Sequence, residues 1–187
     1  MDSRKENKVW FAMRATYCRE LEVKRFLDDR KIENFIPMQY KIVVKNRKKK
    51  RELVPIIHNL IFVHATCAAI WEVKFILPYL QFMTEKKGGI KTSIIVPEEQ
   101  MNRFIAVSGT YDEHLLYFKP EEVNLAKGTK VRIHGGNFDG QEGIFVKVKG
   151  ARDRRLVIYL EGVIAVATAI IHPDLIEVIE EDKSKGK

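Results

Sequence analysis

The side chains best suited to catalysis or metal binding are scattered along the 187-residue chain. The five histidines lack the close pairing on one helix that zinc sites commonly use; they are His58, His64, His114, His134 and His172. The two cysteines, Cys18 and Cys67, are too few for a disulfide framework or a metal cage. We therefore expect no enzyme, no metal and no cofactor, and two reduced thiols in a cytoplasmic protein.

A group of glycines near the middle of the C-terminal half supplies a turn and not a phosphate site. Gly135, Gly136 and Gly140 lack the Gly-Lys-Ser/Thr ending of a phosphate-binding loop. They tolerate positive φ, so the backbone can turn sharply there. No nucleophile stands in a recognisable setting either, which leaves binding as the expected function.

The residues most able to bind a partner are basic. Lysine and arginine fill six of the seven positions in the segment KNRKKKR, and the whole chain has a net charge of +8. Such a segment is either a solvated loop that blunts a sheet edge or a set of phosphate contacts. The density of charge favours phosphate contacts, made by Lys45, Arg47, Lys48, Lys49, Lys50 and Arg51.

The elements that must position this basic segment follow from the hydrophobic pattern. Residues 9–15 are apolar on both faces and predict a central strand, after which Thr16 is suited to cap a helix. Two β-branched runs, 40–44 and 52–57, flank the basic segment and predict a long hairpin with a cationic tip. A further apolar strand is expected at 60–64.

Two more helices are expected in this part of the chain. Thr66 starts the first and Pro78 stops it, while Pro97 occupies the first position of the second. Trp71 and Phe75 form an apolar strip on the first of these helices, and we expect that strip to be core rather than contact surface. Together these elements predict an α+β sandwich, with helices covering an antiparallel sheet.

The C-terminal part of the chain has the pattern of a small β-barrel. Val131 and Ile133 alternate with basic residues before the glycine turn. Further alternating or apolar runs follow at 144–148, 156–160, 163–171 and 175–179. About five short strands in so few residues favour a closed barrel.

The domain organisation follows from these patterns. We expect an N-terminal domain over 1–109 and a barrel over 127–181. Residues 110–126 lack periodicity and predict a linker, and residues 182–187 predict a disordered tail. No apolar run is long enough to span a bilayer, so we expect no membrane partner.

Residues 128–150 resemble a KOW motif, with the spacing GxxVRIxxGxFxGxEGxxxxVxG. Such motifs occur in SH3-like barrels of ribosomal proteins and of the NusG family of transcription elongation factors. The N-terminal half also resembles that family: WFAMRATYCRELEVKRFLDDR is similar to its opening strand and helix, ENFIPM to its second strand, and VPIIHNLIFVH to the segment usually written PLFPGYVFV. The resemblance implies an α+β fold, with a NusG-type sandwich followed by an SH3-like barrel.

One segment departs from the housekeeping pattern of the family. His58, Asn59 and Leu60 stand where housekeeping members usually carry Pro, Gly and Tyr. Together with VIAVATAIIHPDLIEVI near the end, this is more similar to the specialised UpxY-type paralogues, which act on capsular polysaccharide operons. Some specialised relatives refold the C-terminal domain as helices, whereas the β-branched residues of the 163–171 run favour strands here.

The resemblance implies partners for the N-terminal domain. A hydrophobic patch would contact the clamp coiled coil of RNA polymerase through Trp10 or its neighbour Phe11, with Ile57, Leu60 and Phe62. Only alternate strand residues can face a partner, so some of these side chains must be core. Arg14, Arg19 and the basic hairpin would lie near the DNA or RNA of the elongation complex.

The resemblance also implies a partner for the barrel, namely a ribosomal protein, a termination factor or RNA. Its candidate contacts are Asn137, Phe138 and Asp139 in an exposed loop, and Phe145 on the outer face. Phe138 has an alternative role as a lid that folds back on the open end of the barrel.

These implications define a monomeric elongation factor that suppresses pausing or termination, as a specialised antiterminator of polysaccharide-type operons or as a housekeeping factor. The alternative is a KOW-type RNA-binding protein of the translation machinery, which needs the basic surface but not the hydrophobic patch.

Overall fold

The computed structural model describes residues 7–45, 47–118, 128–147, 154–160, 163–168 and 173–179. These residues form two compact units, Met1–Met101 and Asn102–Lys187, and each is described by itself. The expected tail, 182–187, lies outside the described residues, as does the 119–126 part of the expected linker. The fold is α+β with antiparallel sheets throughout.

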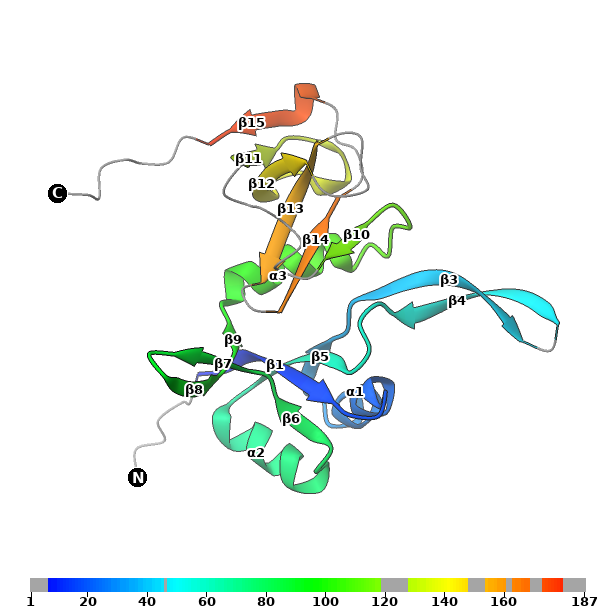
Figure 1. Cartoon of the computed structure of the whole chain (residues 1–187), viewed down its shortest axis with the longest axis vertical. Coiled ribbons are helices and arrows are strands. Elements are labelled where there is room, and N and C mark those ends of the chain that lie inside the picture. The colour runs from blue at the N-terminus through cyan, green and yellow to red at the C-terminus, as the bar shows by residue number, and fades with distance from the viewer. Residues whose placement is uncertain are drawn as a thin grey trace. The chain divides into compact units, whose positions relative to one another are not determined.

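The sheet of the first unit is built around β1. This strand pairs antiparallel with β5, β6 and β9, and the main strand order is β2-β5-β1-β6. The strands are β1 Val9–Ala15, β2 Glu33–Phe35, β5 Leu60–Ala65, β6 Leu80–Phe82 and β9 Ile95–Val96 (Figure 1). The predicted central strand at 9–15 is confirmed, because its two apolar faces are both buried.

Two helices cover one face of this sheet. They are α1, Glu20–Asp29, and α2, Cys67–Ile76. Their inward side chains pack in one core cluster with alternate residues of β1 and β5, namely Val23, Leu27, Ile70 and Val73 with Phe11, Met13, Ile61 and Val63. None of the helices among the described residues has both the length and the apolar character needed to cross a membrane.

The two helices begin differently. Thr66 caps α2 as predicted, because its Oγ1 accepts a hydrogen bond from the Ala69 N–H at 3.2 Å. The predicted Thr16 cap is wrong, because α1 begins only at Glu20, with Arg19 at the N-cap position and no side-chain cap; Thr16 Oγ1 instead donates to the Tyr79 carbonyl at 3.2 Å. The chain instead turns through two left-handed residues, Tyr17 at φ 64 and Cys18 at φ 56, before α1 starts.

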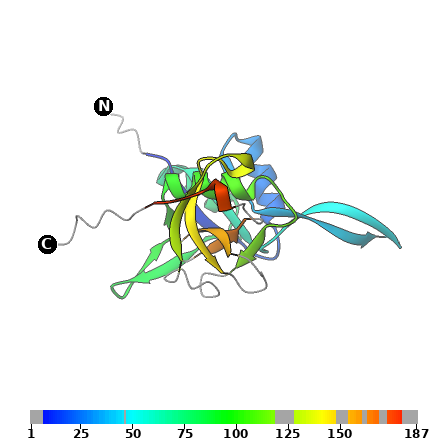
Figure 2. The same cartoon turned by 90° about the horizontal axis from the view of Figure 1, so that it is seen from above.

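Two hairpins leave this sheet. The longer is formed by β3, Met38–Lys45, and β4, Lys48–Pro55, and both views show it as a projecting arm (Figures 1 and 2). The predicted hairpin is therefore present, but β4 begins earlier than expected and places four basic residues on a strand instead of at the tip. The shorter hairpin is formed by β7, Thr84–Lys87, and β8, Ile90–Ser93.

The second unit contains a six-stranded antiparallel sheet in the order β10-β14-β13-β12-β11-β15. Its strands are β10 Leu116–Phe118, β11 Thr129–Ile133, β12 Glu142–Lys147, β13 Arg154–Leu160, β14 Ile164–Ala167 and β15 Ile176–Val178. This β-rich region is consistent with a KOW-type SH3-like domain. The run at 163–171 contains a strand, β14, as its β-branched residues predict.

The sequence pattern does not show where this sheet begins. β10 lies inside the segment expected to be linker, yet it pairs with β14 over three residues. A strand of this length is too short to produce a detectable alternation. The helix α3, Glu98–Ser108, follows Pro97 as predicted, and the boundary between the two units falls within it.

Close packing between strands explains why one position of the KOW-like motif, Gly143, is a glycine. A Cβ atom on Gly143 of β12 would lie 2.6 Å from the Val157 carbonyl oxygen and 2.9 Å from Leu156 Cδ1. Any side chain there would push β13 away, so this position requires glycine for the two strands to pair closely.

Candidate functional site

The candidate protein-binding residues of the first unit lie on β1 and β5. Trp10 pairs with His64, Ala12 with Phe62, and Arg14 with Leu60. Because strand side chains alternate, Trp10, Leu60 and Phe62 share the face that does not carry the α1 and α2 core. We call these three side chains the apolar face. Phe11 belongs to the helix-packed core, so of the two neighbours it is Trp10 that joins the apolar face.

The apolar face is buried in this structure. Trp10, Leu60 and Phe62 are 2%, 3% and 0% exposed. Ile57 precedes β5 in the loop 56–59 and is half-buried. The structure thus gathers three of the sequence-predicted residues on one surface, and a partner reaches them only in a state in which they become accessible.

An asparagine ties together the two loops at the end of this face. Asn59 Oδ1 accepts a hydrogen bond from the Cys18 N–H at 2.7 Å, and the Asn59 carbonyl accepts one from the Ala15 N–H at 2.8 Å. Asn59 has φ 69, a conformation that asparagine and glycine tolerate better than other residues. Glycine would also tolerate this conformation, but it would lack the side-chain contact with the Cys18 N–H.

A buried carboxylate lies beside the same loop. Glu20, the first residue of α1, is 2% exposed, and its Oε1 lies 3.6 Å from His58 Nδ1. Its position in the first turn places it at the positive end of the helix dipole. Among the described residues its Oε2 has no hydrogen-bond partner. Sequence reasoning missed Glu20 because its spacing matches no motif.

The hairpin arm, defined as β3 and β4, carries the basic residues on two faces. Cross-strand pairing places Lys49 and Arg51 with Val44 and Ile42 on one face. Lys48 and Lys50 lie on the other face, as does Lys41. The residues Arg47, Lys48, Lys49, Lys50 and Arg51 are all exposed, and the side chain of Lys45 is outside what the structure describes. The arm therefore presents positive charge in two directions.

The cations of the arm remain accessible although two of them make contacts within it. The Arg51 guanidinium lies 4.1 Å from the centre of the Tyr40 ring, and Lys50 Nζ lies 3.9 Å from Glu52 Oε1. Arg51 and Lys50 are both exposed despite these contacts. A phosphate can therefore compete for these side chains, as a phosphate-binding surface requires.

The other two candidate nucleic-acid contacts lie on different elements. Arg14 is exposed on β1 beside Leu60, at the rim of the apolar face. Arg19 precedes α1, with its guanidinium 4.6 Å from the Tyr79 ring centre and 3.9 Å from Glu22 Oε2. These arginines therefore belong to the central sheet and its first turn, while the remaining candidates belong to the arm.

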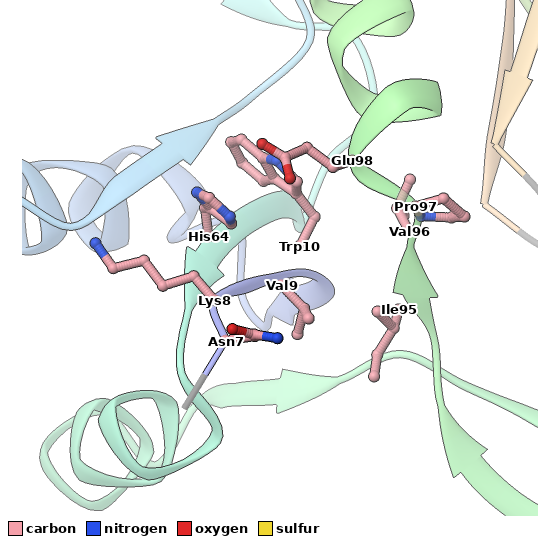
Figure 3. A pocket seen from close by; sticks show the side chains of 9 residues that line it. All are labelled: Asn7, Lys8, Val9, Trp10, His64, Ile95, Val96, Pro97 and Glu98. Atoms are coloured by element: carbon pink, nitrogen blue, oxygen red, sulfur yellow. The ribbon is translucent and has the colours of Figure 1, made fainter. Parts of the chain in front are cut away.

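A cavity of about 480 Å³ lies where β1, β9 and the start of α3 meet (Figure 3). The Trp10 and His64 rings stack in its wall, with centres 4.9 Å apart and planes 11° apart. His64 is held by Glu33, whose Oε2 lies 2.7 Å from His64 Nδ1. Lys8 and Glu98 bring opposite charges to its lining. No motif predicts this cavity, because its walls come from separate segments of the chain.

The candidate contacts of the second unit lie in the glycine turn and on β12. Phe138 is half-buried at the end of the short 3₁₀ helix Gly136–Phe138, and the exposed Asp139 accepts a hydrogen bond from the Gly135 N–H. Phe145 is half-buried and pairs with Leu156, which is fully buried. The side chain of Asn137 lies outside the described residues.

Glu142 joins several basic groups in the second unit. Its Oε1 accepts hydrogen bonds from Arg132 Nη2 at 2.6 Å and Nε at 3.0 Å, and its Oε2 lies 3.0 Å from Arg103 Nη2. The hydrogen bonds from Arg132, aided by the charges of both arginines, hold the pKa of Glu142 below its usual value. This network links β11, β12 and α3 and is structural.

Within the described part of the chain, no three His, Cys, Asp or Glu side chains gather in a way that could hold a metal ion. The features that stand out among the described residues are the buried apolar face, the cavity beside it and the exposed basic arm.

Comparison with known proteins gives the family. A family model described as "Transcription termination factor nusG" matches residues 8–105. A solved structure described as "Domain interaction in Thermotoga maritima NusG" is 20% identical, and its match covers 93% of this chain and 98% of that chain with a TM-score of 0.41. No curated protein matches. Because the family model spans more than half of the chain, including all of β1 to β9, this protein belongs to the NusG family of transcription factors.

Proposed function

We propose that this protein is a cytoplasmic, non-enzymatic elongation factor that binds RNA polymerase and suppresses pausing or termination. The observation that carries this proposal is the register of β1 and β5, which places Trp10, Leu60 and Phe62 on one surface. Ile57 and Arg14 lie at its edge. A small set of apolar anchors beside a cavity suits the helices of the polymerase clamp coiled coil.

Polymerase binding requires a change in accessibility. Trp10, Leu60 and Phe62 are almost fully buried, so the bound state must expose them to the partner. Ile57 is partly accessible, and it provides a first point of contact.

The hairpin arm is the proposed nucleic-acid contact. Its eight paired positions extend about 26 Å, at roughly 3.3 Å per residue, which spans several phosphates of a duplex. Phosphate contacts position a protein without reading sequence, so the arm supplies affinity and orientation. Arg14 and Arg19 add positive charge at the central sheet.

We further propose that residues 127–181 act as a KOW domain with a partner of its own, a ribosomal protein, a termination factor or RNA. Asp139 is exposed, and Phe138 and Phe145 are half-buried, so the turn and β12 together offer polar and aromatic side chains.

The specialised, UpxY-type role is supported by the loop at the edge of the apolar face. Asn59 bonds the Cys18 N–H, and His58 approaches Glu20. Neither contact is possible with the Pro-Gly-Tyr sequence of housekeeping members. The loop that carries Ile57 is thus built differently here, which favours a role distinct from that of a general factor.

A single-round transcription assay with the cognate multisubunit RNA polymerase tests the proposal. We expect more read-through at a pause site and a terminator, and only on templates with the cognate leader sequence if the factor is specialised. The variant Ile57→Asp should lose the effect while staying folded, because Ile57 lies in a loop and is half-exposed.

The matched control is Ile90→Asp, at a 69% exposed position on β8. Equal activity of Ile57→Asp and wild type would contradict the proposed contact. No effect on any template, together with binding to ribosomal RNA, would favour the translation alternative.

A further inference from the structure

The outward side of α2 carries a concentration of exposed apolar side chains. Trp71, Phe75 and Ile76 are 57%, 91% and 52% exposed. The expectation that Trp71 and Phe75 are core is therefore wrong, because α2 turns Ile70 and Val73 into the core instead. Trp71 and Phe75 are neighbours one helical turn apart, and exposed apolar side chains that adjoin in this way mark an interaction site.

The shape of this surface suits a helix. The exposed Cys67, Trp71 and Phe75 follow one another at four-residue spacing and form a row along α2. Rows with this spacing are the ridges that pack into the grooves of a second helix. Phe82 of β6 stands beside the row, with its ring centre 5.5 Å from that of Trp71. The row and Phe82 therefore form an apolar strip along which a helix can lie.

A lysine fixes a positive charge beside this strip. Lys74 Nζ lies 4.8 Å from the centre of the Trp71 ring and 4.4 Å from that of Phe82. These cation–π contacts hold the ammonium in place without neutralising it. A carboxylate on a partner would find it already oriented.

We propose that this surface docks an amphipathic helix of another protein, one that carries acidic residues beside its apolar stripe. We call the surface the α2 face and define it by Trp71, Lys74 and Phe75. The apolar stripe of the partner packs against Trp71 and Phe75, and an acidic residue pairs with Lys74.

Size and charge argue against two other occupants. Trp71 and Phe75 at this exposure offer roughly 300 Å², whereas a stable dimer of two copies needs about 800 Å² from each. An anionic membrane attracts clusters of several cations. Lys74 is the one basic residue of α2. A helix that contacts one face transiently fits both observations.

A designed peptide tests the α2 face in the full-length protein. The probe is a helical peptide with a leucine stripe flanked by glutamates, titrated by calorimetry. We expect micromolar binding that weakens about tenfold or more in Phe75→Asp. Phe75 is almost fully exposed, so this variant should keep the circular dichroism spectrum of the wild type. The matched control, Val178→Asp at a 61% exposed position on β15, should bind normally.

A charge exchange sharpens the test. Lys74→Glu should weaken binding of the acidic peptide and strengthen binding of a peptide with lysines in place of the glutamates. No binding of the acidic peptide at millimolar concentration would overturn the proposal, as would equal binding by Phe75→Asp. Two further results would overturn the proposal in favour of another occupant. A dimer in sedimentation that Phe75→Asp abolishes would favour a second copy of this chain. Binding to phosphatidylserine vesicles that requires Phe75, with no binding of the peptide, would favour a membrane.

Discussion

The apolar face and the hairpin arm lie in the same unit but differ in burial: the side chains of the first are buried, and the basic side chains of the second are exposed. Trp10, Leu60 and Phe62 are buried on the strands at the centre of the sheet, so the same side chains serve folding and the proposed polymerase contact. The arm forms a separate two-stranded sheet whose basic side chains are exposed. Substitutions should therefore affect stability in the first region and only binding in the second.

The difference shows how one small domain can provide two kinds of contact. Apolar anchors need a rigid scaffold, and the scaffold here is a strand paired on both sides. Phosphate contacts act over a longer range and tolerate a projecting arm, because charge does not need close packing.

The largest effect is expected in the apolar face. Phe62→Ala should lower the free energy of unfolding by about 3–5 kcal/mol, because Phe62 is fully buried and the change leaves a cavity. Urea denaturation measures this. Phe75→Ala removes the same atoms at a 91% exposed position and should change stability by less than about 0.5 kcal/mol. Similar losses in the two variants would contradict the contrast between buried and exposed aromatic side chains.

The next effect concerns the arm. Replacing Lys48, Lys49 and Lys50 with Ala should leave unfolding unchanged, since all three side chains are exposed. The slope of log affinity against log salt for binding to the elongation complex should become shallower by about 2.7, at about 0.9 for each phosphate that is no longer neutralised. The matched control removes three lysines from the shorter hairpin, Lys86, Lys87 and Lys91. An equal change in slope with the control would assign the effect to net charge and not to the arm.

The carboxylate of Glu142 is paired with Arg132, so unlike the exposed charges of the arm it should contribute to folding stability. The pKa of Glu142 is lowered by Arg132, so the ionised form stabilises the fold above the unfolded-state pKa of about 4.3. That stabilisation is lost as pH falls through the lower pKa of the folded state. Between about pH 6 and about pH 3, wild type should lose more unfolding free energy than Glu142→Gln. Equal losses would show that the Arg132 pair contributes nothing.

The smallest effect should appear only in alkali. Burial raises the pKa of Tyr117 to about 12, while its hydroxyl lies 2.8 Å from Ser108 Oγ. Because the folded pKa is raised, the stabilisation is complete below about pH 10 and is lost as pH rises towards the folded value. Tyr117→Phe should therefore lose less unfolding free energy than wild type between about pH 9 and about pH 11. Urea denaturation at each pH measures this loss. A steeper loss in the variant would contradict burial as the cause of the raised pKa.

Much of the fold was predictable because local signals agreed with the tertiary structure. The strand at 9–15, the Thr66 cap, the helix after Pro97 and the long hairpin all rest on patterns within a few residues. The candidate site was less predictable. Glu20 and Asn59 act through residues about 40 positions away in the chain, and no local pattern signals such contacts.

What the sequence by itself determined is where strands and helices form and which side chains share a face, because periodicity and capping are local properties. Only the tertiary structure decided which face is covered. Thr16 does not cap α1 because the left-handed turn at Tyr17 and Cys18 delays the start of the helix to Glu20. Phe75 is exposed because the sheet meets the other side of α2. Trp10 rather than Phe11 joins the apolar face because the helices cover the opposite side of β1. Alternation of side chains along a strand shows which residues share a side, but not which of the two sides the rest of the chain will bury.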